Sequence, residues 1–396
     1  MRSSFLVLLQ LLAELNNAAD IVLPPVAAIH GATVQAPLAL DDTVDIEFGS
    51  QFSGLMTFAN VPYVNCFVDS EAQQQRYDIA FIGAPFDTGV TARPGARFGP
   101  AGIRRGSQRI EPDASWSIYT GVNAFTSWAS IVDCGDVPLT FLDNTIALNQ
   151  LGKAHKVVSS RPTNASDVST VPRIITLGGD HTTTLPALRS TYKHWGPVSV
   201  IHFDSHIGWY PPKERANMAV ITNNLCLNTG GGLSSYAGVN HGTFLHIAHE
   251  EGLVLNTSSI HVGIRAPVVR PKKDIQNDIR CGFDIITARD IDRIGTTGIV
   301  EKIKRRVGNN KAYISVDIDV LDPAFAPATG TSEPGGFSTR ELLTILDALV
   351  DTDIQVVGAD VVEVAPIYDT AGESTVLAAA EVAHSLLALM VSRPVR

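Results

Sequence analysis

Three short apolar runs, each followed closely by aspartate and histidine or by paired aspartates, constrain the fold of this chain more than any other feature. Each run is typical of a buried strand. The runs are Arg173–Leu177, Val198–Ile201 and Ala312–Val316. The polar blocks after them are Gly178-Gly179-Asp180-His181, Asp204-Ser205-His206 and Asp317-Ile318-Asp319. Because ligands collect at the carboxyl ends of strands in open α/β sheets, the three blocks are expected to meet at one edge of a sheet.

The side chains in these blocks suit a divalent metal ion. Carboxylates and imidazoles without a thiolate are ligands for a hard to borderline ion such as manganese. Bridging aspartates can hold two such ions about 3.5–4 Å apart, the usual spacing in a two-metal hydrolase. The blocks therefore predict a two-metal site built from distant parts of the chain.

The remaining pattern predicts one large α/β domain. Further strands are expected at residues 77–84, 130–134, 259–264 and 354–364, and helices at 339–350 and 375–392, the first with Ser338 as its N-cap. Strands that alternate with helices predict a mostly parallel sheet covered on both faces, which is a three-layer α/β/α architecture. The last helix is apolar over many turns, but Glu381 and His384 interrupt it, which favours a buried core helix over a membrane span.

The amino terminus predicts a secretory signal peptide over residues 1–19. Arg2 precedes an apolar run, residues 5–12, that is too short to span a bilayer, and Ala18-Ala19 offers a cleavage point. A short amphipathic helix is the alternative, since Glu14 interrupts the tail. Residues 20–75 are expected to form an N-terminal extension, and the location is expected to be secreted or in the secretory pathway. The net charge of −10 disfavours a nucleic acid partner, and no membrane partner is expected.

The four cysteines leave two alternatives open. They are Cys66, Cys134, Cys226 and Cys281, and none forms a CxxC pair, which disfavours a zinc cage. An even count in a secreted chain permits disulfides. Scattered cysteines in a domain with a large core are more often free and buried, and the sequence does not decide between the two states.

In sequence and in order, the three blocks resemble the signature of the ureohydrolases, the arginase and agmatinase family. The likeness continues through Asp322-Pro323, through Arg93–Pro100, which is agmatinase-like, and through Asn240-His241-Gly242-Thr243. It covers roughly residues 75–390. The resemblance implies an arginase-like fold with a catalytic domain over residues 76–396, two Mn²⁺ ions per chain, a small guanidino substrate and assembly into homotrimers or homohexamers.

Several residue roles are implied by the resemblance. The metal ligands are His181, Asp204, His206, Asp317 and Asp319, with Asp204 and Asp317 bridging the two ions. His241 matches a histidine that transfers a proton near the leaving group, a role suited to a side chain whose pKa lies close to the working pH. Glu363 matches a glutamate that pairs with the substrate guanidinium, since a carboxylate accepts a planar fork of two N–H groups.

Three residues near the predicted ligands are given supporting roles. His202 is taken as structural. Asp180 and Asp322 flank the ligands, and each either orients a neighbouring side chain or loop, or caps a turn.

The chain departs from the family pattern at Gly208, where the second aspartate of the middle block is expected. Three explanations are open: impaired catalysis or a single tightly held ion, replacement by a nearby residue such as Glu214, or a non-catalytic member of the family. Residues 214–229 have no clean periodicity and are hypothesised to be an insertion, such as an intron that was read through.

The function expected from these features is metal-dependent hydrolysis of a guanidino compound to urea and an amine. Agmatine, which would give putrescine, is favoured because the flanking motifs are agmatinase-like, and guanidinobutyrate is a close alternative. The competing hypothesis is a degenerate ureohydrolase that acts as a binding or assembly protein because Gly208 lacks a ligand.

Overall fold

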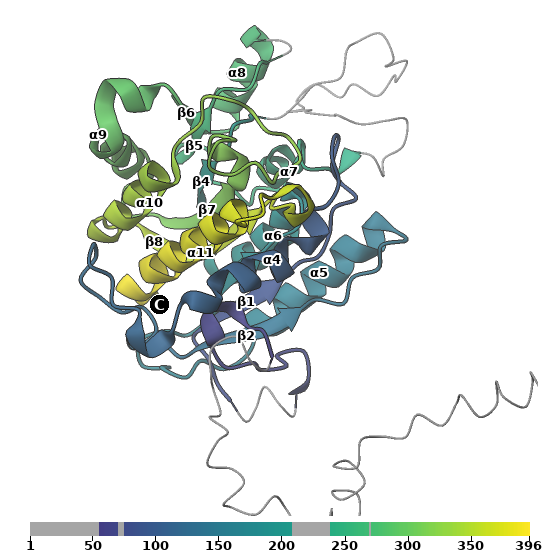
Figure 1. Cartoon of the computed structure of the whole chain (residues 1–396), viewed down its shortest axis with the longest axis vertical. Helices are drawn as coiled ribbons and strands as arrows, with labels where there is room; N and C mark the ends of the chain where they lie inside the picture. The colour runs from purple at the N-terminus through teal and green to yellow at the C-terminus, as the bar shows by residue number, and fades with distance from the viewer. Residues whose placement is uncertain (1–54, 70–74, 208–237, 269–270) are drawn as a thin grey trace, which may run out of the picture. The chain divides into compact units, whose positions relative to one another are not determined.

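An eight-stranded sheet lies at the centre of the computed structural model, which describes residues 55–69, 75–207, 238–268 and 271–396 (Figure 1). The strand order is β2-β1-β3-β8-β7-β4-β5-β6, and all neighbouring strands run parallel. The strands are β1 (Ile79–Gly83), β2 (Ile131–Asp136), β3 (Arg173–Leu177), β4 (Ser199–Phe203), β5 (Ser259–Ile264), β6 (Phe283–Thr287), β7 (Lys311–Asp317) and β8 (Gln355–Val362). The predicted α/β class with a mostly parallel sheet is confirmed.

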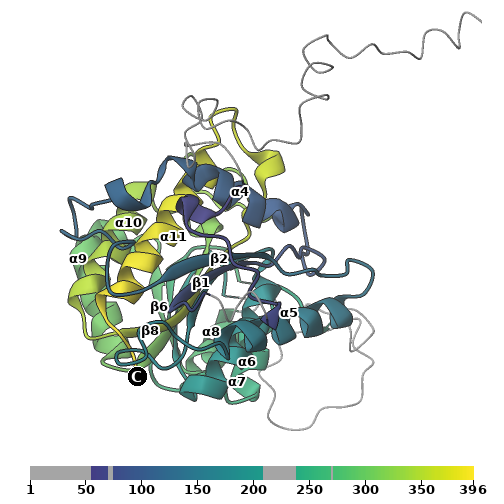
Figure 2. The ribbon, with the colours of Figure 1, turned by 90° about the horizontal axis from the view of Figure 1, so that it is seen from below.

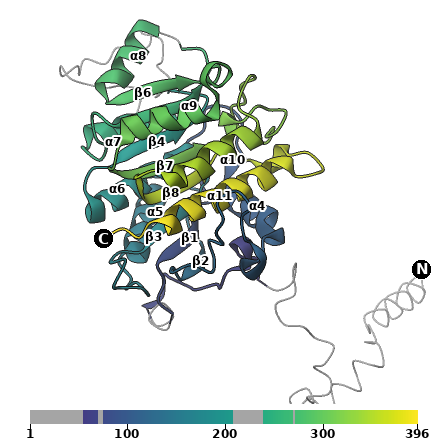
Figure 3. The same ribbon diagram turned by 90° about the vertical axis from the view of Figure 1, so that its left-hand side faces the viewer.

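Helices cover both faces of this sheet, as Figures 2 and 3 show. One layer contains α4 (Gly99–Gly106), α9 (Asp290–Val307), α10 (Thr339–Ala348) and α11 (Ser374–Ser392). The other contains α5 (Asn144–Ser159), α6 (Thr184–Trp195), α7 (Phe244–Glu250) and α8 (Pro271–Arg280). In the first layer α11 packs between α4 and α10, and α10 packs on α9. In the second layer α6 packs between α5 and α7, and α8 packs beside β6 at the sheet edge. These are the three layers expected for an arginase-like fold.

The two helices predicted from the sequence form close to their expected bounds. Ser338 caps α10 through a capping box, because its hydroxyl accepts the Glu341 N–H while the Glu341 carboxylate accepts the Ser338 N–H. Helix α11 is long and apolar enough to cross a membrane by length and composition. It packs against β8 and α10, and Val382, Leu386 and Met390 are fully buried, so it is a core helix.

The first described segment, residues 55–69, packs into the core although it lies within the expected N-terminal extension. Phe58 is fully buried and stacks on Phe81 of β1 with ring centroids 4.1 Å apart. The Asp133 carboxylate of β2 accepts the Phe58 N–H at 2.7 Å and the Arg104 guanidinium at 2.8 Å. The segment therefore covers the β1–β2 edge of the sheet. The signal peptide expected at 1–19, most of the extension, Gly208 and the suspected insertion at 214–229 lie outside the described residues.

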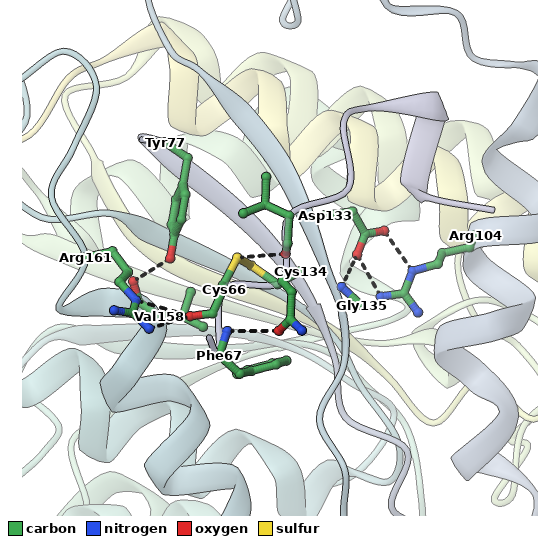
Figure 4. The surroundings of a disulfide bond; sticks show 11 residues. Cys66, Phe67, Tyr77, Arg104, Asp133, Cys134, Gly135, Val158 and Arg161 are labelled. Carbon is green, nitrogen blue, oxygen red and sulfur yellow. Dashed lines mark hydrogen bonds and ion pairs between the residues drawn. A yellow bond between two sulfur atoms is a disulfide. The ribbon is translucent and has the colours of Figure 1, made fainter. Parts of the chain in front are cut away.

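A disulfide joins this segment to the sheet. Cys66 and Cys134 are bonded with their Cα atoms 5.3 Å apart, 68 residues apart in sequence, and the Arg161 guanidinium donates to the Cys66 carbonyl oxygen beside them (Figure 4). Cys281 is disulfide-bonded as well. The described cysteines are thus paired, which answers the question that the sequence left open.

Removing the Cys66–Cys134 bond is expected to lower the free energy of unfolding by about 2–4 kcal/mol, because the bond closes a long loop in the unfolded chain. The measurement is urea unfolding of the Cys66→Ala/Cys134→Ala double variant beside the unaltered chain, each with and without a reductant. The double variant should lose most of its sensitivity to the reductant. Equal unfolding midpoints for the unaltered chain and the double variant would contradict this expectation.

Candidate metal centre

Three strand ends bring the predicted ligands into one cluster. The loops after β3, β4 and β7 leave the same edge of the sheet, with only β8 between β3 and β7. His181 Nδ1 lies 3.2 Å from Asp204 Oδ2 and 3.1 Å from Asp317 Oδ2. His206 Nδ1 lies 3.2 Å from Asp204 Oδ1 and 3.0 Å from Asp319 Oδ2. The two oxygens of Asp204 thus face two different imidazoles, which is the arrangement that a bridging carboxylate needs.

The charge of this cluster suits cations. Asp204, Asp317 and Asp319 are all buried. Burial and the nearby carboxylates of Asp319 and Asp204 hold the pKa of Asp317 well above its usual range. Burial alone would lower the pKa of His206, but Asp319 and Asp204 outweigh it and raise that pKa to about 12. Positive charge is therefore strongly favoured between these carboxylates, and the residues present fit a pair of divalent ions.

A buried hydrogen-bond chain sets the orientation of the His181 ring. Ser315 Oγ donates to Asp360 Oδ1 at 2.6 Å, so it is free to accept from His181 Nε2 at 2.8 Å. The hydrogen on Nε2 leaves Nδ1 as the ligand atom, and Nδ1 is the atom that faces the carboxylates. The sequence analysis missed both supporting residues. Ser315 lies two positions before Asp317 on the same face of β7, and Asp360 is a charged residue inside a buried strand.

A close backbone contact behind His181 explains the second glycine of its block. A Cβ atom on Gly179 would lie 1.8 Å from the Phe86 carbonyl oxygen. The same oxygen accepts the Asp180 N–H at 2.7 Å. The Asp180 carboxylate caps the turn that begins at His181 and accepts the Gly89 N–H at 2.7 Å. Asp180 therefore both caps a turn and holds the loop after β1.

Asp322, the other flanking carboxylate, has a turn role. It accepts backbone N–H groups of Ala324, Gly335 and Gly336. It thereby closes the loop that carries Glu333, whose carboxylate lies 3.7 Å from His206 Nε2.

Glu363 presents one unpaired oxygen in a buried place. It follows β8 with φ at +61°, a left-handed conformation that is uncommon for a residue with a side chain. Its Oε1 accepts the His181 N–H at 2.9 Å, whereas its Oε2 has no hydrogen-bond partner among the described residues, although the side chain is 1% exposed. A buried carboxylate oxygen without a donor is suited to a ligand that brings N–H groups.

His241 lies against this carboxylate. Its Nδ1 is 3.1 Å from Glu363 Oε1, and its Nε2 accepts the Thr91 N–H at 3.1 Å, so the ring proton belongs on Nδ1. Burial would lower the pKa of His241, but the contact with Glu363 outweighs burial and raises it. Both predicted catalytic residues are thus held in contact beside His181, while Thr91, which holds the ring, was not identified from the sequence.

A cavity of about 570 Å³ opens onto the cluster. Its lining includes His181, Asp204, His206 and Asp317, with His241 on the same wall. Phe244 also lines it and stacks on the His181 ring at 4.3 Å. A small molecule in this cavity would contact the metal cluster and His241 together.

Comparisons with known proteins agree with this geometry. The model of the family described as "Arginase family" matches residues 77–389. The chain is 50% identical over 354 residues to "Putative agmatinase 1" of Schizosaccharomyces pombe, covering 87% of this chain and 84% of that protein. It is 36% identical over 315 residues to an agmatinase of Neisseria meningitidis, covering 79% and 87% of the two chains.

A solved structure shares the fold. Proclavaminate amidinohydrolase of Streptomyces clavuligerus superposes with a TM-score of 0.70 at 31% identity, covering 87% of this chain and 99% of that chain.

Proposed function

The chain belongs to the arginase family of amidinohydrolases, and we propose that it hydrolyses the guanidinium group of agmatine to give urea and putrescine. The observation that carries the proposal is one cavity lined by His181, Asp204, His206, Asp317 and His241. The remaining ligand, Asp319, contacts His206, and Glu363, with its unpaired oxygen, contacts both His181 and His241. The relatives named agmatinase support agmatine over other guanidino compounds.

Each residue has a defined part in this proposal. Five residues would hold a pair of divalent ions, which we propose to be Mn²⁺: His181, Asp204, His206, Asp317 and Asp319. When bound, such ions would lower the pKa of a water molecule to near neutrality and so supply the nucleophile. Glu363 Oε2 accepts N–H groups of the substrate guanidinium and orients its carbon toward the cluster. His241 supplies, in its protonated form, the proton that the departing amine takes up, and the contact with Glu363 favours that form by raising the pKa of His241.

The competing hypothesis of a non-catalytic binding protein has no support among the described residues. It was motivated by Gly208 alone, whereas the described cluster retains both histidines and all three aspartates in contact.

The proposal predicts release of urea in a direct assay. Purified chain with added Mn²⁺ is expected to release urea from agmatine with a higher kcat/KM than from 4-guanidinobutyrate or arginine. Preference for 4-guanidinobutyrate would overturn the substrate assignment while retaining the reaction. Absence of urea from every guanidino compound, in a folded sample shown to contain metal, would overturn the proposed function.

We also propose that the protein matures in the secretory pathway. The Cys66–Cys134 disulfide and the disulfide at Cys281 support this location, because such bonds persist in oxidising compartments.

A further inference from the structure

We infer that His202 is an additional metal ligand, which supplies an imidazole to the ion held by His181. This inference rests on the proposed two-metal centre. It assigns to His202 a role that the motif pattern does not provide, and it revises the structural interpretation made from the sequence.

The first argument is the position of the His202 ring. Nε2 lies 3.0 Å from Asp204 Oδ2, which is also the oxygen that faces His181. The rings of His181 and His202 have centroids 4.9 Å apart. Together the three side chains form a fully buried group of donor atoms within 4.8 Å of one another. Two neighbouring ligands of one ion, each about 2.0–2.2 Å from it, lie about 3 Å apart, which is the spacing found here.

The second argument is that His202 Nε2 is a buried atom that faces the Asp204 carboxylate. The residue is 2% exposed, and its Nε2 has no hydrogen-bond partner among the described residues. The close approach to Asp204 Oδ2, at 3.0 Å, is a contact with another ligand of the cluster. Ligands of one ion have this relation, because their lone pairs point to the ion rather than to each other.

The third argument is the support behind the ring. A histidine that binds a metal through one nitrogen almost always donates its other N–H to a fixed acceptor. His202 Nδ1 lies 2.7 Å from Nδ1 of His261, its register partner on β5, and Nε2 of His261 lies 3.8 Å from the Asp278 carboxylate. Of the two possible directions of this hydrogen bond, the inference requires donation from His202 to His261, which leaves Nε2 of His202 unprotonated and available as a ligand.

The chemical need for such a ligand is visible in the sequence. Gly208 has no side chain, so the middle block contributes one carboxylate, Asp204, and one imidazole, His206. With His202, the ion beside His181 has two imidazoles and two carboxylates from the chain. Imidazole is a better ligand for Co²⁺ and Zn²⁺ than carboxylate is. This site is therefore expected to prefer Co²⁺ and Zn²⁺ over Mn²⁺ more strongly than a site with an aspartate in place of His202.

The test measures metal binding without reference to catalysis. Metal-free chain is titrated with Co²⁺ by calorimetry and by the visible absorption of the bound ion. The variant is His202→Gln, and the matched control is His155→Gln, since His155 is equally buried and its Nε2 also lacks a partner, but it lies on α5. We expect His202→Gln to weaken one of the two Co²⁺ sites at least about 10-fold and to alter its spectrum. The control should bind both ions as the unaltered chain does.

A second variant separates ligation from a packing defect. The Gly208→Asp background restores the aspartate that the family pattern has at this position, so His202→Gln should cost far less metal affinity there than in the unaltered chain. Equal losses in the two backgrounds would indicate a structural role and overturn the inference.

If His202→Gln does not fold, X-ray absorption of the Co²⁺-loaded unaltered chain decides the question. It should detect three imidazoles per pair of ions, from His181, His202 and His206, and two imidazoles would overturn the inference. Failure of the unaltered chain to bind any Co²⁺ would instead count against the proposed metal centre itself.

Discussion

Replacing Glu363 by glutamine is expected to lower kcat/KM for agmatine about 100- to 1,000-fold, which corresponds to about 3–4 kcal/mol. The side chain keeps its shape, but the buried carboxylate that we propose binds the substrate guanidinium loses its charge. Its Oε2 accepts no hydrogen bond from the described residues, so it can accept one from the substrate guanidinium without breaking another. Removing one member of a buried charge pair costs far more than removing a surface pair, because the other charge is left without compensation.

The matched control for this prediction is Glu373→Gln. Glu373 also has a positive φ, at +55°, but it is at the surface in an ion pair with Arg105. Its substitution should change kcat/KM by less than about twofold. Binding of metal should survive in both variants, since neither residue is a ligand. A Glu363→Gln enzyme with kcat/KM near that of the unaltered chain would remove Glu363 from the proposed site.

Replacing Gly208 by aspartate is expected to raise both metal affinity and kcat about 10- to 100-fold. Loss of support around a metal ligand already costs this much, and a directly bound carboxylate contributes at least as much. Metal content after gel filtration, together with urea release at limiting Mn²⁺, measures the gain. Gly238→Asp is the control, because it adds the same charge to the same connection between β4 and α7 at a position with open space around its Cα.

The Gly208→Asp experiment also tests the family alignment at this position. If the unaltered chain already holds two ions tightly, the substitution should bring little gain in metal affinity. Gly208 would then not mark a missing metal ligand. If neither Gly208→Asp nor Gly238→Asp changes metal content or activity, residue 208 does not correspond to the family's metal-ligand position.

Strands and helix ends that a short stretch of sequence specifies could be predicted. Strands β3 and β5 begin and end where the sequence placed them, because a buried parallel strand is a short apolar run that stops at polar or turn-forming residues. Ser338 at the start of α10 was equally clear, since a capping box lies within four residues. Strand β6 (Phe283–Thr287) was missed because it is an edge strand whose residues alternate between buried and exposed without a long apolar run.

The sequence by itself determined which chemical groups the site contains. Each ligand block closely follows an apolar run typical of a buried strand, and parallel strands present their carboxyl ends at one edge of the sheet. Convergence of His181, His206 and the three aspartates was therefore expected from local pattern.

Only the tertiary structure decided how those groups are oriented and what lies behind them. The Ser315–Asp360 pair that orients His181, the Thr91 N–H that holds His241, and the unpartnered Nε2 of His202 all depend on contacts between residues far apart in the chain. Such contacts are set by strand order and register, which no local periodicity encodes.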